Sequence, residues 1–331
     1  CHFHELPSFF EEGVYPVDVA FISVSEPNEE GYCSFGVSCD YTKPAAECAR
    51  IVVAEVNKQM PFIGGDNLIH VTKLDYIVPV DRPLVEIPPA PIGEVEQRIG
   101  EICAELIEDG DTLQIGIGAI PDAVLQCLQG RKDLGLHTEM FTDGVMHMIQ
   151  SGHVTGEKKT LHHRKVASSI IMGSKALYDF IDHNEMIEMY PVHHMNDPYV
   201  IGQNDRMVSI NSCLEIDLYG QVASEAIGLE QFSGTGGQVD YLRGAKRSRG
   251  GRSILAFTST AKGGTVSRIV PVLPPGATVT SGRNEVDYIA TEYGAVRLRG
   301  LTLRERALAL VSIAHPDFRL GLMAAIEERF S

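Results

Sequence analysis

No long apolar run occurs in this sequence. No stretch approaches the roughly 18 consecutive apolar residues that suggest a membrane-spanning helix, and the amino end, Cys-His-Phe-His-Glu, has neither the basic nor the apolar region of a secretory signal peptide. We therefore expect a cytoplasmic protein with no membrane partner. The chain begins on Cys1 and is in a strand-like run by residue 17, so we also expect a chain that is missing its start.

Cysteine is sparse and has no metal-binding spacing. The seven cysteines, at positions 1, 33, 39, 48, 103, 127 and 213, form no Cys-x-x-Cys pair and no zinc-type pattern. An odd number scattered along a chain is typical of reduced thiols, most of them buried. We therefore expect no metal site and no redox cofactor.

Basic side chains are outnumbered. The chain carries 28 Lys and Arg against 44 Asp and Glu, a net charge of -16, which repels nucleic acid and anionic membranes in general. A polyanionic ligand must therefore be held by local groups, such as backbone N–H groups, helix N-termini or a basic cluster. One cluster exists: Arg243, Lys246, Arg247, Arg249 and Arg252. We expect a solvated surface loop there, with phosphate contact as the alternative.

The chain has enough apolar material for two domains, with 331 residues of which 44% are hydrophobic. Segments with β-branched character alternate with helical patterns, which predicts an α/β fold with largely parallel sheets. Prolines 88, 89 and 91 make the segment 85–91 unsuitable for a helix or a central strand. We place the domain boundary there, giving domains 1–88 and 89–331.

The expected elements follow from residue periodicity and turn signals. In the first part they are strands at 17–24, 75–80, 112–117 and 135–141 and helices at 46–54, 92–108 and 122–128. In the second part they are short strands at 208–210, 221–222, 253–257 and 268–272 and helices at 303–313 and 318–329.

A glycine loop joins the strand at 112–117 to a helix opened by Pro121. Gly116 and Gly118 let the backbone approach a ligand, and a helix N-terminus favours anions. Glu139 follows, near the end of the strand at 135–141. Because loops after the carboxyl ends of strands gather at one rim of an open α/β sheet, this carboxylate is a candidate reagent. The alternative is a solvated carboxylate at a strand end.

The same loop invites a rival interpretation, a dinucleotide-binding fingerprint. Glu139 lies about 20 residues beyond the glycines, where an acidic residue would bind ribose hydroxyls. However, Pro121 stands where that motif has its third glycine, so the motif is incomplete. A nicotinamide-dependent dehydrogenase is therefore kept as an alternative from a different functional class.

Two further segments carry groups that could stabilise an oxyanion. Asn196, in an Asn-Asp-Pro turn, has a side-chain amide that could donate to one, although the residues alone favour an ordinary Asx turn. Gly236 and Gly237 lie in a glycine-rich loop whose N–H groups could converge on an oxyanion or a pyrophosphate. A plain flexible loop accounts for those glycines equally well.

Two pairs of polar residues each have a functional and a structural interpretation. His193 and His194 invite a metal ion, but neighbours in sequence point apart, so structural or supporting roles are favoured. Glu215 and Asp217 share a strand face and could form a carboxylate pair, or they are simply the polar side of that strand.

Taken together, these segments resemble the family I CoA-transferases of the acetyl-CoA hydrolase/transferase type. The matching words are GYCSFGVS (31–38), DYTKPAA (40–46), VNKQMP (56–61), GIGAIP (116–121), HTEM (137–140), NDP (196–198), GGQVD (236–240), TEYG (291–294) and AHPD (314–317). They occur in order along nearly the whole chain. Members of the family carry more first-domain sequence before the point where this chain begins.

The resemblance implies two open α/β sheet domains of the CoA-transferase type, the first incomplete at its N-terminus, with acyl-CoA bound between them. It implies that Glu139 is the nucleophile and that Asn196 and the Gly236 or Gly237 N–H stabilise the oxyanion. The CoA chain would lie along Gly116, Ile117, Gly118, Ala119 and Ile120, near Leu214, and at Gly237.

The implied reaction moves CoA between a short-chain acyl-CoA, such as acetyl-CoA, and a short carboxylic acid such as butyrate or 4-hydroxybutyrate. It passes through an acyl-glutamyl anhydride and a glutamyl-CoA thioester, needs no cofactor beyond CoA as substrate, and suggests a homo-oligomer. An acyl-CoA hydrolase is the nearest alternative. A non-catalytic CoA-binding protein is a further one.

Overall fold

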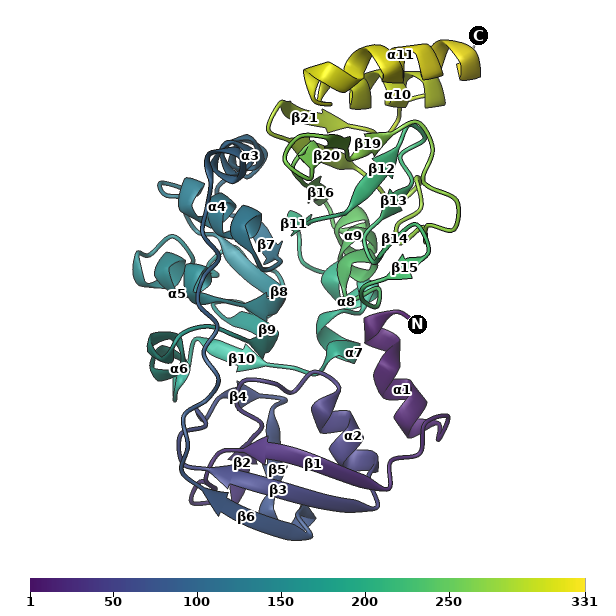
Figure 1. Ribbon diagram of the computed structural model, residues 1–331. Coiled ribbons are helices and arrows are strands. Elements are labelled where there is room, and N and C mark those ends of the chain that lie inside the picture. The colour runs from purple at the N-terminus through teal and green to yellow at the C-terminus, as the bar shows by residue number, and fades with distance from the viewer. Residues whose placement is uncertain (331) are drawn as a thin grey trace.

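The computed structural model describes residues 1–330, which form a two-part α/β molecule (Figure 1). Its helices are η1 Phe3–Glu5, α1 Leu6–Glu11, α2 Thr42–Cys48, η2 Val71–Lys73, α3 Glu94–Glu105, α4 Ala119–Cys127, α5 Asp143–Gln150, α6 Lys175–Ile181, α7 Val192–Met195, α8 Pro198–Ile201, α9 Gln238–Arg247, α10 Leu303–Ser312 and α11 Pro316–Phe330. Among residues 1–330, no helix is both long and apolar enough to cross a membrane.

The strands divide among one large sheet and several small ones. They are β1 Val19–Val24, β2 Tyr32–Ser34, β3 Ile51–Asn57, β4 Gly64–Gly65, β5 Leu68–His70, β6 Tyr76–Val80, β7 Thr112–Ile115, β8 Gly135–Phe141, β9 Val166–Ile171, β10 Ile187–Met189, β11 Met207–Asn211, β12 Glu215–Asp217, β13 Val222–Ala223, β14 Ala226–Ile227, β15 Glu230–Gln231, β16 Arg252–Ala256, β17 Thr260–Ala261, β18 Val266–Ser267, β19 Ile269–Val270, β20 Tyr288–Thr291 and β21 Gly294–Arg297.

The large sheet has nine strands in the order β21-β20-β16-β11-β7-β8-β9-β10-β4. Every neighbouring pair is parallel except β20 and β21, which form an antiparallel pair at one edge. The central strands β7 and β8 are buried for most of their length, as expected where helices cover both faces of a parallel sheet.

Helices lie on both faces of this sheet. In Figure 1, α3, α4, α5 and α6 follow one another along one side, and α7, α8 and α9 lie on the other. The carboxyl ends of the parallel strands lie together at one end of the sheet, and the candidate site forms there.

The smaller part is a parallel sheet, β1-β3-β6, with the β2–β5 pair and α2 beside it. Its contacts with the large sheet include β4, which pairs with β10 as an edge strand, and Ser38, which forms an isolated bridge with Ile170. The segment around residues 35–41 therefore reaches the carboxyl end of β9, next to β8.

The α/β class expected from the sequence is confirmed, and the strand at 135–141 has the expected limits. The helix expected at 46–54 is wrong for most of its length, because α2 ends at Cys48 and residues 51–57 form β3 between β1 and β6. Burial between two parallel strands outweighs the helix propensity of its alanines. The division into 1–88 and 89–331 stays a prediction, although residues 81–93 contain no helix or strand.

Candidate active site

Glu139 is the fifth residue of β8 and lies near the strand's carboxyl end. Side chains alternate across a strand, so Glu139 and His137 share one face. The intervening Thr138 faces β7, where its hydroxyl donates to the Ile115 carbonyl at 3.2 Å. Glu139 itself is partly exposed. The carboxylate is therefore delivered by a rigid central strand and stays open to a ligand.

Asn196 comes to Glu139 from the short helix α7. Its backbone N–H donates to the Val192 carbonyl at 2.8 Å, closing that helix. Its buried side-chain amide donates to Oε2 of Glu139 at 2.5 Å. The Asx turn that the residues alone favoured for Asn196 is wrong, because Asp197 makes that turn instead, with Oδ1 accepting from the Tyr199 N–H.

The backbone of Gly237 lies next to both the Glu139 carboxylate and the Asn196 amide. A Cβ added at this position would overlap Oε2 of Glu139 and lie 2.5 Å from Nδ2 of Asn196. Only glycine lets the backbone come this close. Gly236, directly before it, has a φ of +57° in the left-handed region. The loop thus turns sharply into α9 and sets its backbone against the carboxylate.

The surroundings of the Glu139 carboxyl group do little to stabilise its negative charge. Burial raises its pKa to about 7; the hydrogen bond from Asn196 works against this, while the charges of Asp240 and Asp40 add to it. Asp40 belongs to the first 88 residues and Asp240 to the first turn of α9. Near neutral pH, Glu139 is therefore divided between its neutral and its ionised form, and the ionised form is weakly stabilised.

The glycine loop lies beside this group. Leu113 pairs with Leu136, and Thr138 contacts Ile115 at the end of β7, so Gly116 leaves β7 near the carboxyl end of β8. The Gly116 N–H donates to the Ile210 carbonyl of β11 at 3.2 Å. Gly118 has a φ of +113°, which favours glycine, and starts α4. The helix thus begins three residues earlier than the expected 122, since Pro121 is tolerated in a first turn whose N–H groups have no partner within the helix.

A cavity of about 380 Å³ lies at the start of α4. Ile117 and Gly118 line it together with Pro88 and Pro89 of the linker and Met172 after β9. Leu214 follows β11 at the same edge of the sheet, where its carbonyl accepts from Nε of Arg268 at 2.7 Å. No pattern in the sequence indicated that the linker prolines lie beside the glycine loop.

Members of the two pairs of polar residues contact other parts of the fold, and their structural role stays a prediction. His194 lies with its Nε2 3.0 Å from Nε2 of His162 and packs on the Tyr190 ring. Among residues 1–330, no group of three or more His, Cys, Asp or Glu side chains is placed to hold a metal ion. Asp217 accepts from the backbone of the turn after β12, while Glu215 is only half-buried beside it.

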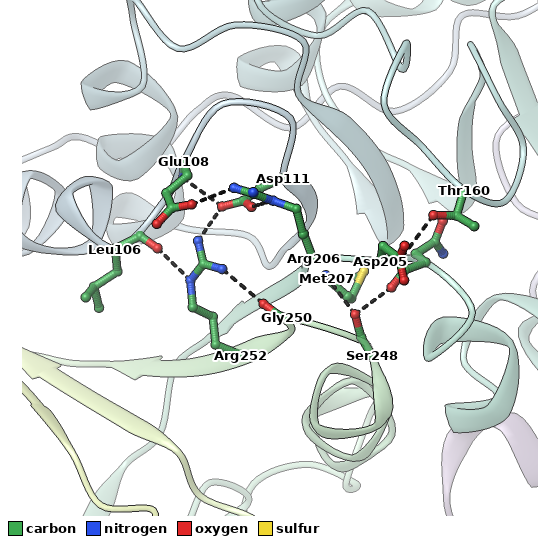
Figure 2. Close-up of polar contacts among 11 residues, drawn as sticks. Leu106, Glu108, Asp111, Thr160, Asp205, Arg206, Met207, Ser248, Gly250 and Arg252 are labelled. Carbon is green, nitrogen blue, oxygen red and sulfur yellow. Dashed lines mark hydrogen bonds and ion pairs between the residues drawn. The ribbon is translucent and has the colours of Figure 1, made fainter.

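The basic cluster is not a surface loop. Residues 243–247 belong to α9, and Arg252 is the first residue of β16. Arg243 is paired with Glu285 at 2.6 Å, and Lys246 donates to the Asn284 carbonyl at 2.8 Å. Arg252 is paired with Asp111 (Figure 2). The expected loop is therefore wrong for all of these cations except Arg249, because the others belong to α9 or β16, although Lys246, Arg247 and Arg249 are exposed to solvent as expected.

Two residues that the sequence did not single out as functional lie directly behind Asn196. His137 of β8 and Tyr241 of α9 both hydrogen-bond to the carbonyl of Met195. The two-residue spacing between His137 and Glu139 was the one available signal, since it puts both side chains on one face of the strand.

Two family descriptions match the chain. The acetyl-CoA hydrolase/transferase N-terminal domain matches residues 1–89, and the C-terminal domain of the same name matches residues 173–326.

Three individual proteins are similar over nearly the whole chain. The 4-hydroxybutyrate coenzyme A transferase of Clostridium kluyveri is 58% identical over 330 residues, covering 100% of this chain and 77% of that protein. A probable butyrate:acetyl-CoA coenzyme A-transferase of Syntrophomonas wolfei is 40% identical, covering 96% of this chain and 72% of that protein. The crystal structure of a 4-hydroxybutyrate CoA-transferase from Porphyromonas gingivalis superposes with a TM-score of 0.92 at 64% identity, covering 100% of this chain and 80% of that one.

Proposed function

The chain belongs to the acetyl-CoA hydrolase/transferase family, and on this premise we propose that it is a CoA-transferase in which Glu139 is the nucleophile. One observation carries the assignment of the residue. Three chain segments far apart in sequence bring an amide side chain, a glycine backbone and a strand-borne carboxylate together at Glu139. Such convergence on a carboxylate of raised pKa is typical of a catalytic site.

In the first half-reaction, an oxygen of the Glu139 carboxylate attacks the carbonyl carbon of the acyl-CoA thioester. The carbon–sulfur bond breaks, CoA leaves as the thiolate, and an acyl-glutamyl anhydride forms. The thiolate then attacks the glutamyl carbonyl carbon, breaks the anhydride, and releases the first carboxylate. The product is a glutamyl-CoA thioester, with no net change in protons.

In the second half-reaction, an incoming carboxylate repeats these steps in reverse and leaves with CoA. Covalent catalysis divides one difficult exchange into easier steps. Burial favours the reaction, because a carboxylate that water and cations stabilise weakly gives up little when it becomes a neutral anhydride or thioester.

Each attack passes through a tetrahedral oxyanion. We assign its stabilisation to the second N–H of the Asn196 amide and to the backbone N–H at Gly236 or Gly237, since Asn196 and Gly237 border the Glu139 carboxylate. A preorganised donor of this kind is typically worth roughly 3 to 4 kcal/mol to the transition state. We place CoA along the glycine loop from Gly116 to Ile120 and near Leu214, where the cavity lined by Ile117 and Gly118 supports the assignment.

The acids that we propose are short and unbranched, such as acetate, butyrate and 4-hydroxybutyrate, since the three similar proteins described above are named for 4-hydroxybutyrate or butyrate. We also propose a homo-oligomer located in the cytoplasm.

The test is the exchange of CoA between acetyl-CoA and butyrate, with Glu139→Ala as the variant. We expect ping-pong kinetics in the wild type, no exchange in the variant, and a hydroxylamine-sensitive adduct that peptide mass mapping locates at Glu139. Glu215→Ala is the matched control, because Glu215 is also a partly buried glutamate of raised pKa, and it should keep its activity.

Three other outcomes would decide against the proposal. Exchange that survives in Glu139→Ala would remove Glu139 from the reaction. Thioester loss that is independent of added carboxylic acid would make the protein an acyl-CoA hydrolase. Tight NAD binding by calorimetry would favour the dehydrogenase suggested by the incomplete glycine motif.

A further inference from the structure

We propose that the buried carbonyl of Met195 is an anchor for Asn196, and that His137 and Tyr241, which both donate to it, are positioning residues for CoA transfer. The inference rests on the proposed function, in which Asn196 stabilises the oxyanion next to Glu139. Neither positioning residue needs to touch substrate. Each acts through the peptide group that carries Asn196.

The anchor joins three elements at one atom. Nε2 of His137, on β8, lies 2.9 Å from the Met195 oxygen, and the hydroxyl of Tyr241, on α9, lies 3.0 Å from it. Met195 and His137 are fully buried, and Tyr241 is 1% exposed. Water therefore cannot replace either donor without a rearrangement of the core.

The chemistry fixes the state of His137. A carbonyl oxygen can only accept, so the hydrogen must be on Nε2, which leaves Nδ1 as the bare nitrogen. Nδ1 is buried and has no hydrogen-bond partner among the described residues. Burial, followed by the charge of Lys159, lowers the pKa of His137 well below its ordinary value. The ring thus stays neutral and keeps one defined tautomer.

The two donors control the orientation of a single peptide plane. The Met195 carbonyl and the Asn196 N–H belong to the same planar group. The N–H is held by the Val192 carbonyl at 2.8 Å, and the oxygen is held by His137 and Tyr241. Since α7 has only four residues, its own hydrogen bonds do not fix its last carbonyl. The direction of the Asn196 side chain toward Glu139 therefore depends on those two donors.

The same residues connect the anchor to the rest of the site. His137 precedes Glu139 by two residues on the same face of β8. The backbone N–H of Tyr241 donates to the Gly237 carbonyl at 3.0 Å. The Met195 oxygen is therefore linked to Glu139 through His137, to Gly237 through Tyr241, and to the Asn196 amide through their shared peptide group.

The main test is Tyr241→Phe, which removes one hydroxyl and keeps the ring. We expect kcat to fall about 10-fold, the size of one lost buried hydrogen bond, with the KM for acetyl-CoA unchanged. Tyr178→Phe is the matched control, because Tyr178 is also a mostly buried tyrosine whose hydroxyl donates to a backbone carbonyl, that of Val85 at 2.8 Å. It should match the change in Tm and leave kcat unaltered.

A double-mutant cycle separates positioning from general stability. In an Asn196→Ala background, Tyr241→Phe should lower kcat by less than about 2-fold, because the group that it positions has been removed. His137→Leu should lower kcat at least as much as Tyr241→Phe. His137→Gln places an amide N–H near the position of Nε2 and should recover most of that loss.

The outcomes distinguish this inference from the proposed function. If Glu139→Ala abolishes exchange and Asn196→Ala impairs it, but Tyr241→Phe acts equally in both backgrounds or not at all, the anchor is wrong and the reaction stands. If Glu139→Ala keeps exchange, the reaction itself is wrong. Should His137→Leu fail to fold, the Tyr241→Phe cycle and the His137→Gln variant still decide the question.

Discussion

Two largely buried carboxylates lie at opposite ends of the parallel strands in the large sheet, and their electrostatic surroundings are opposite. Asp111 lies directly before β7 and forms ion pairs with Nε of Arg206, at 2.9 Å, and with the guanidinium of Arg252 (Figure 2). It also accepts a hydrogen bond from the Glu108 N–H at 2.7 Å. Glu139, near the carboxyl end of the adjacent strand β8, receives one amide N–H and faces further negative charge.

This contrast indicates what each edge of the sheet is for. At the amino-terminal ends of the strands, Arg206 directly precedes β11 and Arg252 is the first residue of β16. Their shared anion, Asp111, therefore ties together the starts of three neighbouring strands, β7, β11 and β16. At the carboxyl-terminal edge, a carboxylate without a cation is costly to bury but is available to react. The same residue chemistry therefore serves stability at one edge, and we propose that it serves catalysis at the other.

The most severe test of this contrast is Gly237→Ala. The added methyl group would displace the Glu139 carboxylate or the Asn196 amide, since a Cβ there would overlap Oε2 of the first and lie 2.5 Å from Nδ2 of the second. We expect kcat/KM to fall by about 10²- to 10³-fold, as when an oxyanion donor is lost. Gly234→Ala is the control in the same loop, because a Cβ there meets no atom within 4 Å. Equal activity in the two variants would contradict the geometry.

At the other edge, Asp111→Asn should affect stability and spare the reaction. It leaves Arg206 and Arg252 without their shared anion, and Arg252 has a side chain only 15% exposed. We expect a loss of about 3 kcal/mol in the free energy of unfolding, measured with urea, and an unchanged kcat in the folded enzyme.

The control for Asp111→Asn comes from the same basic cluster. The Arg249 side chain is 87% exposed and pairs with Asp205. Arg249→Ala should leave the unfolding midpoint where it is, because exposed ion pairs contribute little. A loss of kcat in Asp111→Asn would mean that the two edges are not independent.

Glu139→Gln should stabilise the protein, and only at higher pH. Burial raises the folded-state pKa of Glu139 to about 7 from an ordinary 4.5, so the folded protein holds a proton that the unfolded chain has lost between those values. Stability therefore falls as pH rises through that range. At pH 8 the variant should be more stable by about 2 kcal/mol after allowance for partial exposure. The difference should vanish near pH 4.

The smallest expected effect is on the pH dependence of the rate. If the ionised form of Glu139 attacks, kcat/KM should fall about 10-fold between pH 7 and pH 6 or just below. The profile should be the same in Asp111→Asn, since that carboxylate belongs to the other edge of the sheet. A flat profile in the wild type would contradict the assignment of an ionised nucleophile with this pKa.

The local elements around the site were largely predictable from the residues. The strand at 135–141 has its expected bounds, and the order of strand, glycine loop and helix at 112–127 was correct although α4 begins earlier. By contrast, periodicity within residues 46–54 could not show that most of the segment becomes a central strand. Its neighbours in β1 and β6 are distant in sequence and decide its burial.

Of the candidate site, the residues alone offered Glu139 with a solvated strand-end carboxylate as the alternative, and Asn196 as an Asx turn. The family resemblance named Glu139, Asn196 and Gly237 together, and these three groups lie side by side in the fold, whereas their catalytic roles stay predictions. For His137 the one local signal was its two-residue spacing from Glu139 on β8, and no local signal indicated Tyr241. They act on a backbone oxygen, and a backbone oxygen leaves no pattern in a sequence.

Short-range periodicity and ordered motifs were enough to indicate the α/β class, the family and the strand that carries Glu139. They could not establish that Asn196, 57 residues away, and Gly237 would border that carboxylate, or that Asp111 would be neutralised while Glu139 was not. Only the tertiary structure decides those contacts. Partnership between side chains depends on distance in space, and separation along the sequence does not reveal it.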